Sequence, residues 1–326
     1  MKIYAFFGKI VIGIISVIFL WATAGVAGFP ERPIQVMAGW PVGSMNDTMD
    51  RAITKPLSKI LGQPVIMQNV PGGGGALVLG RIKTEKPDGY TLFQTGLPMY
   101  SQTPWTRAVP YDSMKDFAYL VQHIRYEHYM LCNSDRPWKT YEELIQYVKK
   151  NPKTIRYGTT GVGSSTHIML EYLAIKEGMQ WTHVPYNSTP ELVSALLGGH
   201  LDFAALPLAA ELEFIKTGRF RPLLNLTDKR MQHLPDLPTV MEKGYDFNVA
   251  SSATWTVSAK TPKNIQQILE KALLQAISSP EARACFTALN RTYDPVGSEA
   301  LTKAVFADYK KYGELMRTFK LGIFKK

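Results

Sequence analysis

The chain has 326 residues, of which 45% are hydrophobic and 11% aromatic, and this is enough apolar material for two α/β domains with cores of their own. The formal net charge is +10, which favours anionic partners through long-range attraction. The basic residues are scattered, with no basic run longer than two, so the pattern argues against nucleic acid as the partner.

The N-terminal 27 residues have the pattern of a secretory signal peptide. They contain two lysines, no acidic residue, an apolar stretch from Ile10 to Trp21 and an end rich in small residues. We expect cleavage after Ala27, or as a second choice after Ala24, and the remaining chain then carries a net charge of +8. An uncleaved membrane anchor is the alternative, because the uncharged run approaches the ~20 residues that span a bilayer.

Short β-rich runs alternate with helical runs along the rest of the chain, which predicts an α/β fold. The helical run at 47–61, for example, places Met49, Ile53 and Leu57 on one stripe. In chain order, the predicted elements are a strand at 34–40, a helix at 47–61, strands at 64–69 and 90–96, a helix at 140–150, a strand at 155–159, a helix from Thr166, a strand at 182–185, a helix from the capping box at 188–191, a strand at 200–206, a strand at 253–257, and helices at 262–278 and 301–319. No linker marks a single domain boundary, so we expect the chain to cross between two lobes more than once.

Two loops, each between a predicted strand and a predicted helix, contain glycines and small polar residues. We call residues 41–47 the first loop and residues 158–166 the second loop. Glycine lets the backbone approach a ligand closely, and the free N–H groups at a helix start favour anions. In an open α/β sheet the ligand crevice lies at the carboxyl ends of the strands. The two loops could therefore hold one carboxylate between two lobes, and ordinary helix capping is the alternative reading.

Motifs for phosphate cofactors and for hydrolases are absent from the sequence. The glycine run at 72–75 does not continue into a dinucleotide fingerprint, and neither a P-loop nor a G-x-S-x-G motif occurs. Ser164, Ser165 and His167 lie close in sequence and could suggest a nucleophile with its base. Residues two or three apart at a helix start do not aim at one another, so a hydrolase stays a minor alternative. We expect no enzyme and no cofactor.

The chain contains two cysteines, Cys132 and Cys285, far apart in sequence. Neither belongs to a C-x-x-C motif or to a metal-ligand spacing. An oxidising compartment would permit a disulfide, but the separation and the apolar neighbours favour two buried free thiols. The sequence therefore predicts no metal site.

Short segments recur along the chain in an order typical of one protein family. They are residues 29–34, Gly43 with Asp47 and Arg51, residues 61–65, 69–73, 87–92, 161–164 with His167, 183–186, 197–199, 237–240 and Gly244. In this order and spacing the chain resembles the Bug-type solute-binding proteins of tripartite tricarboxylate transporters. Each segment is weak alone, but the series covers nearly all of the chain after residue 28.

The resemblance implies a two-lobed, type II-like periplasmic binding fold with the ligand in the cleft between the lobes. Lobe 1 would comprise residues 28–128 and 250–326, and lobe 2 residues 129–249. The residues implied to hold a ligand carboxylate are Gly43, Ser44, Asn46 and Asp47 in the first loop, Gly163, Ser164, Ser165 and His167 in and after the second loop, Thr95 and Gly96 at the end of the intervening strand, and Pro207.

The implied partners are a small organic carboxylate and the membrane permease of a tripartite transporter, and the protein would be a periplasmic monomer. A sensory receptor that presents the same ligand to a signalling kinase is the alternative. The sequence departs from the family pattern at Ser44, Met45 and Asn46, and at Leu206, where an acidic residue is common. With Trp40 beside the first loop, these changes predict a less polar far side of the pocket, suited to an aromatic or alkyl carboxylate.

Overall fold

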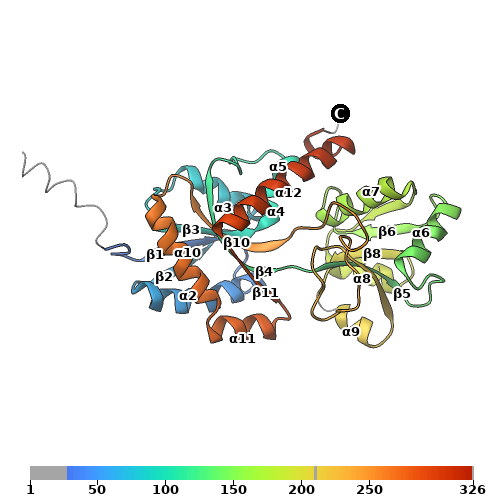
Figure 1. The fold of residues 1–326 in the computed structure, drawn as a ribbon, viewed down its shortest axis with the longest axis horizontal. Coiled ribbons are helices and arrows are strands. Elements are labelled where there is room, and N and C mark those ends of the chain that lie inside the picture. Colours follow the sequence, from blue (N-terminus) through green and yellow to red (C-terminus); the bar gives the residue numbers. More distant parts are fainter. Residues whose placement is uncertain (1–27, 209–210, 325–326) are drawn as a thin grey trace, which may run out of the picture.

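The structure, a computed structural model, describes residues 28–208 and 211–324. The predicted signal peptide and its cleavage position after Ala27 lie outside these residues. Within the described ranges, no helix combines the length and the apolar character that crossing a bilayer requires. The chain forms two sheets, each covered by helices, that stand side by side along the longest axis of the molecule (Figure 1).

The larger sheet forms the centre of what we call lobe 1. Its six strands lie in the order β11-β4-β10-β3-β1-β2, with bounds β1 Ile34–Ala38, β2 Val65–Asn69, β3 Thr91–Gly96, β4 Phe117–Arg125, β10 Ser252–Ser258 and β11 Thr292–Gly297. Strand β1 runs parallel to β2 and β3, whereas β10 is antiparallel to β3 and β4. The carboxyl ends of β1 and β3 therefore open at the same edge of the sheet, where parallel strands place their ligand loops.

Helices cover both faces of the lobe 1 sheet. Their bounds are α2 Met45–Leu61, α3 Ala76–Gly80, α4 Leu97–Ser101, α5 Thr103–Thr106, α10 Lys263–Ile277, α11 Pro280–Ala288 and α12 Ser298–Thr318, with short 3-10 helices at Gly73–Gly75, Arg81–Lys83 and Gly322–Phe324. The predicted stripe of α2 packs with Ile34 and Val36 and with α10 and α11 in one core cluster. Met37 and Phe93 face the other way, toward α3, α4 and α12. The alternation of strand side chains thus builds two cores, one on each face.

The smaller sheet forms the centre of lobe 2. Its order is β7-β6-β8-β5-β9, with bounds β5 His128–Asn133, β6 Arg156–Thr159, β7 Thr182–Pro185, β8 Phe203–Pro207 and β9 Phe220–Asn225. The helices around it are α6 Tyr141–Lys150, α7 Ser165–Glu177, α8 Thr189–Leu197 and α9 Glu211–Lys216. Strand β6 is parallel to β7 and β8, so the loop after β6 points toward the edge that faces lobe 1. The predicted α/β, two-lobed fold class is confirmed.

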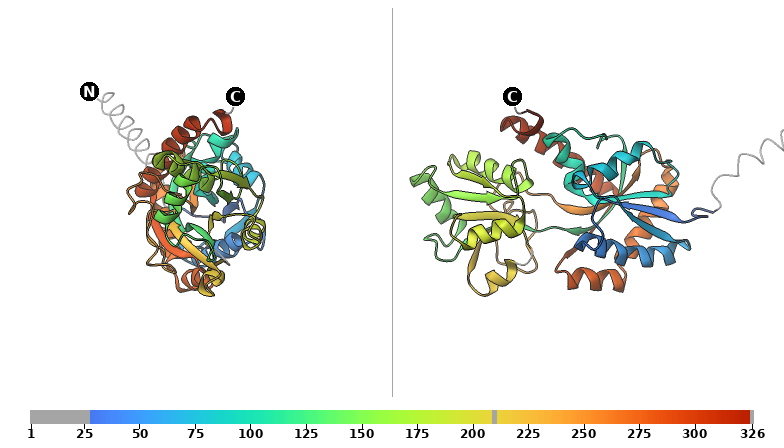
Figure 2. Two further views of the ribbon diagram at one scale, coloured as in Figure 1. Left: turned by 90° about the vertical axis from the view of Figure 1, so that its right-hand side faces the viewer. Right: turned by 180° about the vertical axis from the view of Figure 1, so that it is seen from behind.

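Three segments of the described chain join the lobes. The chain passes from β4 to β5 at 126–127 and returns from β9 to β10 at 226–251. Helix α12 is the third link, because it starts on the lobe 1 sheet and runs toward α7 (Figures 1 and 2). Tyr312 and Met316, in the last third of α12, are fully buried in the core cluster of lobe 2. The C-terminal helix thus belongs to both cores.

Most elements with local patterns were predicted within a few residues, including the helix caps Thr140 and Ser188. The helix expected at 47–61 begins two residues earlier, at Met45, with Ser44 as its cap. Two predicted strands were too long: the run at 34–40 ends at Ala38, and the run at 200–206 begins at Phe203. Strands β4, β5, β9 and β11 were not predicted. Both cysteines are free thiols, but the expectation that both are buried was wrong, because Cys285 lies half-exposed on α11.

Candidate functional site

The first loop leads from β1 into α2 through a capped helix start. The hydroxyl of Ser44 accepts a hydrogen bond from the N–H of Asp47 at 3.3 Å, and the carbonyl of Ser44 accepts one from Thr48. Gly43 has φ = +77°, a left-handed conformation that glycine adopts without strain. Capping leaves the first N–H groups of α2, those of Met45 and Asn46, available at the positive end of the helix dipole.

Asp47 is the centre of the polar network beneath the first loop. One carboxylate oxygen, Oδ2, accepts hydrogen bonds from the Gly43 N–H at 2.8 Å and from Arg51 Nε at 3.0 Å. The other, Oδ1, accepts one from Asn69 Nδ2 at 2.8 Å. Burial alone would raise the pKa of Asp47, but the hydrogen bonds from Arg51, Gly43 and Asn69 lower it, so the carboxyl stays ionised. Because both oxygens are engaged within lobe 1, Asp47 shapes the loop.

Trp40 and the end of β3 form the wall next to the first loop. The indole Nε1–H of Trp40 donates to Gln94 Oε1 at 2.5 Å, while the Nε2 of Gln94 is buried without a partner among the described residues. The hydroxyl of Thr95 is also buried, and it lies close to the backbone of Gly75. Gly96 ends β3, directly precedes α4 and lies near the Trp40 ring. Thr95 therefore lies below the surface, whereas Trp40 is half-exposed.

The second loop leads from β6 into α7 through an equivalent capped start. The hydroxyl of Ser164 accepts the N–H of His167 at 3.3 Å, and Gly163 has φ = +78°. The N–H of Gly163 donates to Nδ1 of His167 at 3.1 Å. The first N–H groups of α7, those of Ser165 and Thr166, are left available in the same way as in the first loop.

The histidines beside the second loop are neutral. The ring of His167 stacks on that of His183 with centroids 4.1 Å apart, and His183 Nε2 is 2.8 Å from the Thr159 hydroxyl. Burial lowers the pKa of His167 and of His183 to about 4. The Nδ1 of His167 accepts a backbone N–H, and the Ser164 hydroxyl accepts one too, so neither is arranged as a nucleophile with its base.

Lobe 1 holds the second loop directly. The hydroxyl of Tyr312, on α12, donates to the Gly163 carbonyl at 2.6 Å. The hydroxyl of Ser165 donates to Oε1 of Gln102, which lies between α4 and α5. Among the described residues, no hydrogen bond or ion pair joins the second loop to the first.

The first turn of α2 reaches the crossing between the lobes. The hydroxyl of Tyr126 donates to Oδ1 of Asn46 at 2.5 Å. Arg291, just before β11, donates from Nη1 to the Leu208 carbonyl at 3.0 Å, and its Nε lies 2.9 Å from the sulfur of Met45. Pro207, at the end of β8, pairs with His128 in the lobe 2 sheet. Sequence reasoning missed Tyr126 and Arg291, since neither lies in a recognisable pattern.

Both loops expose apolar side chains at their tips. Val42 is 74% exposed, Val162 65% and Met45 40%. An apolar surface of this kind at the rim of a polar site suits a ligand that carries an apolar body.

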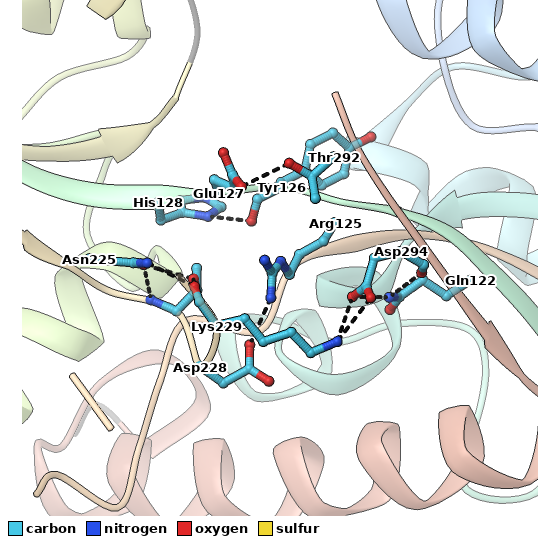
Figure 3. Close-up of polar contacts among 11 residues, drawn as sticks. Gln122, Arg125, Tyr126, Glu127, His128, Asn225, Asp228, Lys229, Thr292 and Asp294 are labelled. Atoms are coloured by element: carbon cyan, nitrogen blue, oxygen red, sulfur yellow. Dashed lines mark hydrogen bonds and ion pairs between the residues drawn. The ribbon is translucent and has the colours of Figure 1, made fainter. Parts of the chain in front are cut away.

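A separate cavity of about 430 Å³ lies at the crossing between the lobes, and no predicted site residue lines it. Its walls come from α12, from the ends of β4 and β11, and from residues 246–252. Figure 3 shows two ion pairs at its rim, Lys229 with Asp294 at 2.9 Å and Arg125 with Asp228 at 3.3 Å. These pairs join residues distant in sequence, so they could not be predicted from local patterns.

The described part of the chain contains no group of three or more histidine, cysteine, aspartate or glutamate side chains that could hold a metal ion. The polar groups at the two loops are backbone N–H groups, hydroxyls and amides. Their chemistry suits an anion held by hydrogen bonds.

Comparison with known proteins places the chain among transport receptors. The family described as "Tripartite tricarboxylate transporter family receptor" matches residues 49–321. The UPF0065 protein in the gbd 5′ region of Cupriavidus necator is 35% identical over 80% of this chain and 80% of its own length.

Solved structures show the same fold. A TctC solute-binding protein from Polaromonas, solved without ligand, is 24% identical, with a TM-score of 0.81 over 89% of this chain and 100% of its own. Rpa4515 of R. palustris, solved with adipate, is 22% identical, with a TM-score of 0.70 over 90% of this chain and 99% of its own.

Proposed function

The chain belongs to the tripartite tricarboxylate transporter receptor family, a family of periplasmic solute-binding proteins, and from this premise we propose that it captures an organic carboxylate between its lobes and delivers it to a membrane permease. The observation that carries the proposal is the pair of capped helix starts, one in each lobe, each with a contact at the boundary between the lobes. Each leaves two N–H groups beyond those that capping satisfies.

The proposed grip uses backbone groups on both sides of the ligand. Met45 and Asn46 would donate from α2, and Ser165 and Thr166 from α7. Hydrogen bonds to a charged group contribute about 1.5–3 kcal/mol each, and the helix dipoles add to them. The positive net charge of the chain would speed the encounter with an anion.

We propose a ligand with an apolar body, such as an alkyl or aromatic carboxylate. The half-exposed Trp40 and the exposed Val42, Met45 and Val162 support this choice. Leu206 is fully buried in the core of lobe 2, so this position offers no acidic group to an amino acid. Adipate, an alkyl dicarboxylate, is the ligand of one structure with the same fold.

Clamp closure is the proposed mechanism. A ligand that bridges the two lobes favours the state in which both loops contact it. The proposed lobe 1 comprises residues 28–128 and 250–326, and the proposed lobe 2 comprises residues 129–249. Its binding stabilises the folded protein by about 2.7 kcal/mol at a concentration a hundred times the dissociation constant. The closed form would then dock on the permease.

A panel of acids tests the proposal by calorimetry and thermal shift. Adipate, longer alkyl dicarboxylates and benzoate should bind, and leucine should not. Stabilisation by citrate alone would contradict the apolar ligand body, and binding of no acid would contradict the carboxylate receptor itself. N-terminal sequencing of the exported protein, expected to begin at Gly28, tests the signal peptide.

A further inference from the structure

Gln102 lies where α4 meets α5, and three parts of the molecule meet at its amide. Its side chain is only 4% exposed. The Nε2 group donates to the carbonyl of Ala250 at 3.1 Å and to Oδ2 of Asp308 at 3.3 Å, and Oε1 accepts the hydroxyl of Ser165. Ala250 belongs to the returning crossing, Asp308 to α12 and Ser165 to lobe 2. One amide thus donates to the returning crossing and to α12 and accepts from lobe 2.

The hydroxyl of Ser165 has no role in capping α7. The cap is Ser164, whose hydroxyl accepts the N–H of His167. The Ser165 side chain is therefore free to reach out of the helix, and it reaches lobe 1. Because its own N–H is one of the groups proposed to hold the ligand, a hydrogen bond that fixes the side chain also fixes the direction of that N–H.

A second contact from α12 fixes the other end of the same turn. The carbonyl of Gly163 accepts the Tyr312 hydroxyl at 2.6 Å. A trans peptide is planar, so holding this carbonyl sets the direction of the Ser164 N–H on the opposite side. Asp308 and Tyr312 are four residues apart and share one face of α12. The helix therefore supports both contacts at once.

We propose that Gln102 is a positioning residue, which holds the ligand-binding turn of lobe 2 on lobe 1 and couples that turn to the returning crossing and to α12. This inference rests on the proposed function, because it assigns a role to a turn that the ligand would contact. Its first test needs no ligand, since these contacts join protein groups only.

The test compares Gln102→Leu with the matched control Gln266→Leu. Gln266 is 7% exposed, and its Nε2 donates to the Thr261 carbonyl at 2.7 Å, but it lies on α10 within lobe 1. Both variants lose a buried amide, and only the first loses contact with lobe 2. Amide hydrogen exchange without ligand is measured at Gly163, His167 and Ile168, whose N–H groups are hydrogen-bonded in the turn.

Gln102→Leu should speed exchange at these three amides about fivefold, the factor expected for one net hydrogen bond. Gln266→Leu should leave them unchanged. Equal exchange in the two variants would overturn the positioning role. A double-mutant cycle distinguishes this positioning role from a purely structural one. Ser165→Ala alone should speed amide exchange as much as Gln102→Leu does, and the double variant should exchange little faster than either single variant. Additive effects would also overturn the inference.

Calorimetry with adipate as the probe keeps the two proposals apart. If wild-type protein binds adipate, Gln102→Leu should weaken binding about five- to tenfold, by the loss of the same contact, and Gln266→Leu less than twofold. If wild-type protein binds neither adipate nor any other acid of the panel, the proposed function fails, while the exchange experiment still decides whether Gln102 positions the turn.

Discussion

The polar network beneath the first loop lies within lobe 1, whereas the second loop also forms a hydrogen bond with a residue of the other lobe. Asp47 collects hydrogen bonds from Gly43, Arg51 and Asn69, all in lobe 1. The second loop has its own cap, yet Gln102 of lobe 1 holds its first helical residue, and Tyr312 of α12, the helix that belongs to both cores, holds its backbone. Similar sequences thus produce one loop that is rigid by itself and one whose geometry depends on how the lobes are arranged.

This difference predicts that the two loops have different roles when the lobes close on a ligand. A loop that is shaped in advance loses little conformational entropy when a ligand arrives, so it suits the first encounter. A loop that is held across the boundary changes its surroundings when the lobes move, so it suits the response to the ligand. Substitutions that affect one loop and leave the other unchanged test whether the loops differ in this way.

Asp47→Ala should have the largest effect, because three donors lose their acceptor at once. We expect affinity for adipate, or for the tightest acid of the panel, to fall at least about a hundredfold, and the unfolding free energy to fall by about 2–4 kcal/mol. Calorimetry and urea titration measure the two quantities. Hydrogen exchange at His167, in lobe 2, should stay as in the wild type.

Thr140→Ala is the control for the loss of a helix cap. Thr140 caps α6 by accepting the Glu143 N–H at 3.2 Å, and α6 carries none of the predicted site residues. It should lose about 1 kcal/mol of stability and no affinity. If Asp47→Ala behaves like this control, the first loop is not part of the site.

Asp308→Asn should change stability in a way that depends on pH. Burial raises the pKa of Asp308 to about 6 from an ordinary 3.8, so the folded protein keeps a proton that the unfolded chain has already released. The contribution of this proton to the free energy of unfolding is complete below pH about 4 and is lost as the pH rises through about 6. The variant should therefore be more stable than the wild type by about 1–3 kcal/mol at pH 8 and equal at pH 4.

Thermal or urea unfolding at the two pH values measures this difference. Because asparagine still offers an oxygen to Gln102, the second loop should keep its slow exchange. A stability difference that is the same at pH 4 and pH 8 would contradict a buried, proton-binding carboxyl at this position.

Gly163→Ala should weaken binding more than it destabilises the fold. Because φ is +78° at this position, replacing glycine by a residue with a Cβ should lower the folding stability by about 1 kcal/mol. An added Cβ would lie 3.6 Å from Thr106 and 3.9 Å from Met316, so it meets no clash and the backbone conformation is the main cost. We expect about a tenfold loss of affinity for the panel's tightest acid, measured by calorimetry, because the strained turn carries N–H groups of the proposed site.

Gly178→Ala provides the matched control for Gly163→Ala. Gly178 ends the same helix, α7, has φ = +64° and has open space where a Cβ would be added. Its loss of stability should equal that of Gly163→Ala, with unchanged affinity. Equal affinities in the two variants would remove the second loop from the site.

Lys229→Met should have the smallest effect. The Lys229 ammonium pairs with Asp294 across the crossing at 2.9 Å, and its side chain is 55% exposed. Exposed pairs contribute about 0.5 kcal/mol, so we expect about a twofold change in affinity that vanishes at high salt. Lys303→Met, which removes a pair with Glu299 within α12, should change nothing at either salt concentration. A salt-independent change would contradict an electrostatic contact between the lobes.

The sequence predicts features whose causes are local. Helix caps, glycine stops and strand alternation act within a few residues, and for this reason α2, α6, α7 and the strand β7 were placed closely. The positions of both loops followed from the same patterns.

Contacts between distant parts of the chain could not be predicted in this way. Gln102 lies 63 residues from Ser165 and 206 from Asp308, and it stands in no motif. Arg291 and Tyr126 contact the first turn of α2 only because α11 and the crossing pack beside it. Strand β4 was missed because it is buried on both faces and lacks the alternation of a half-exposed strand.

In the proposed site one carboxylate ligand engages both helix starts, so four backbone amides should respond to it together. Nitrogen-resolved NMR of the protein with and without the tightest acid of the panel should shift the N–H signals of Met45, Asn46, Ser165 and Thr166 together and slow their exchange. If saturating ligand protects only Met45 and Asn46, or only Ser165 and Thr166, the ligand is not held between the two loops.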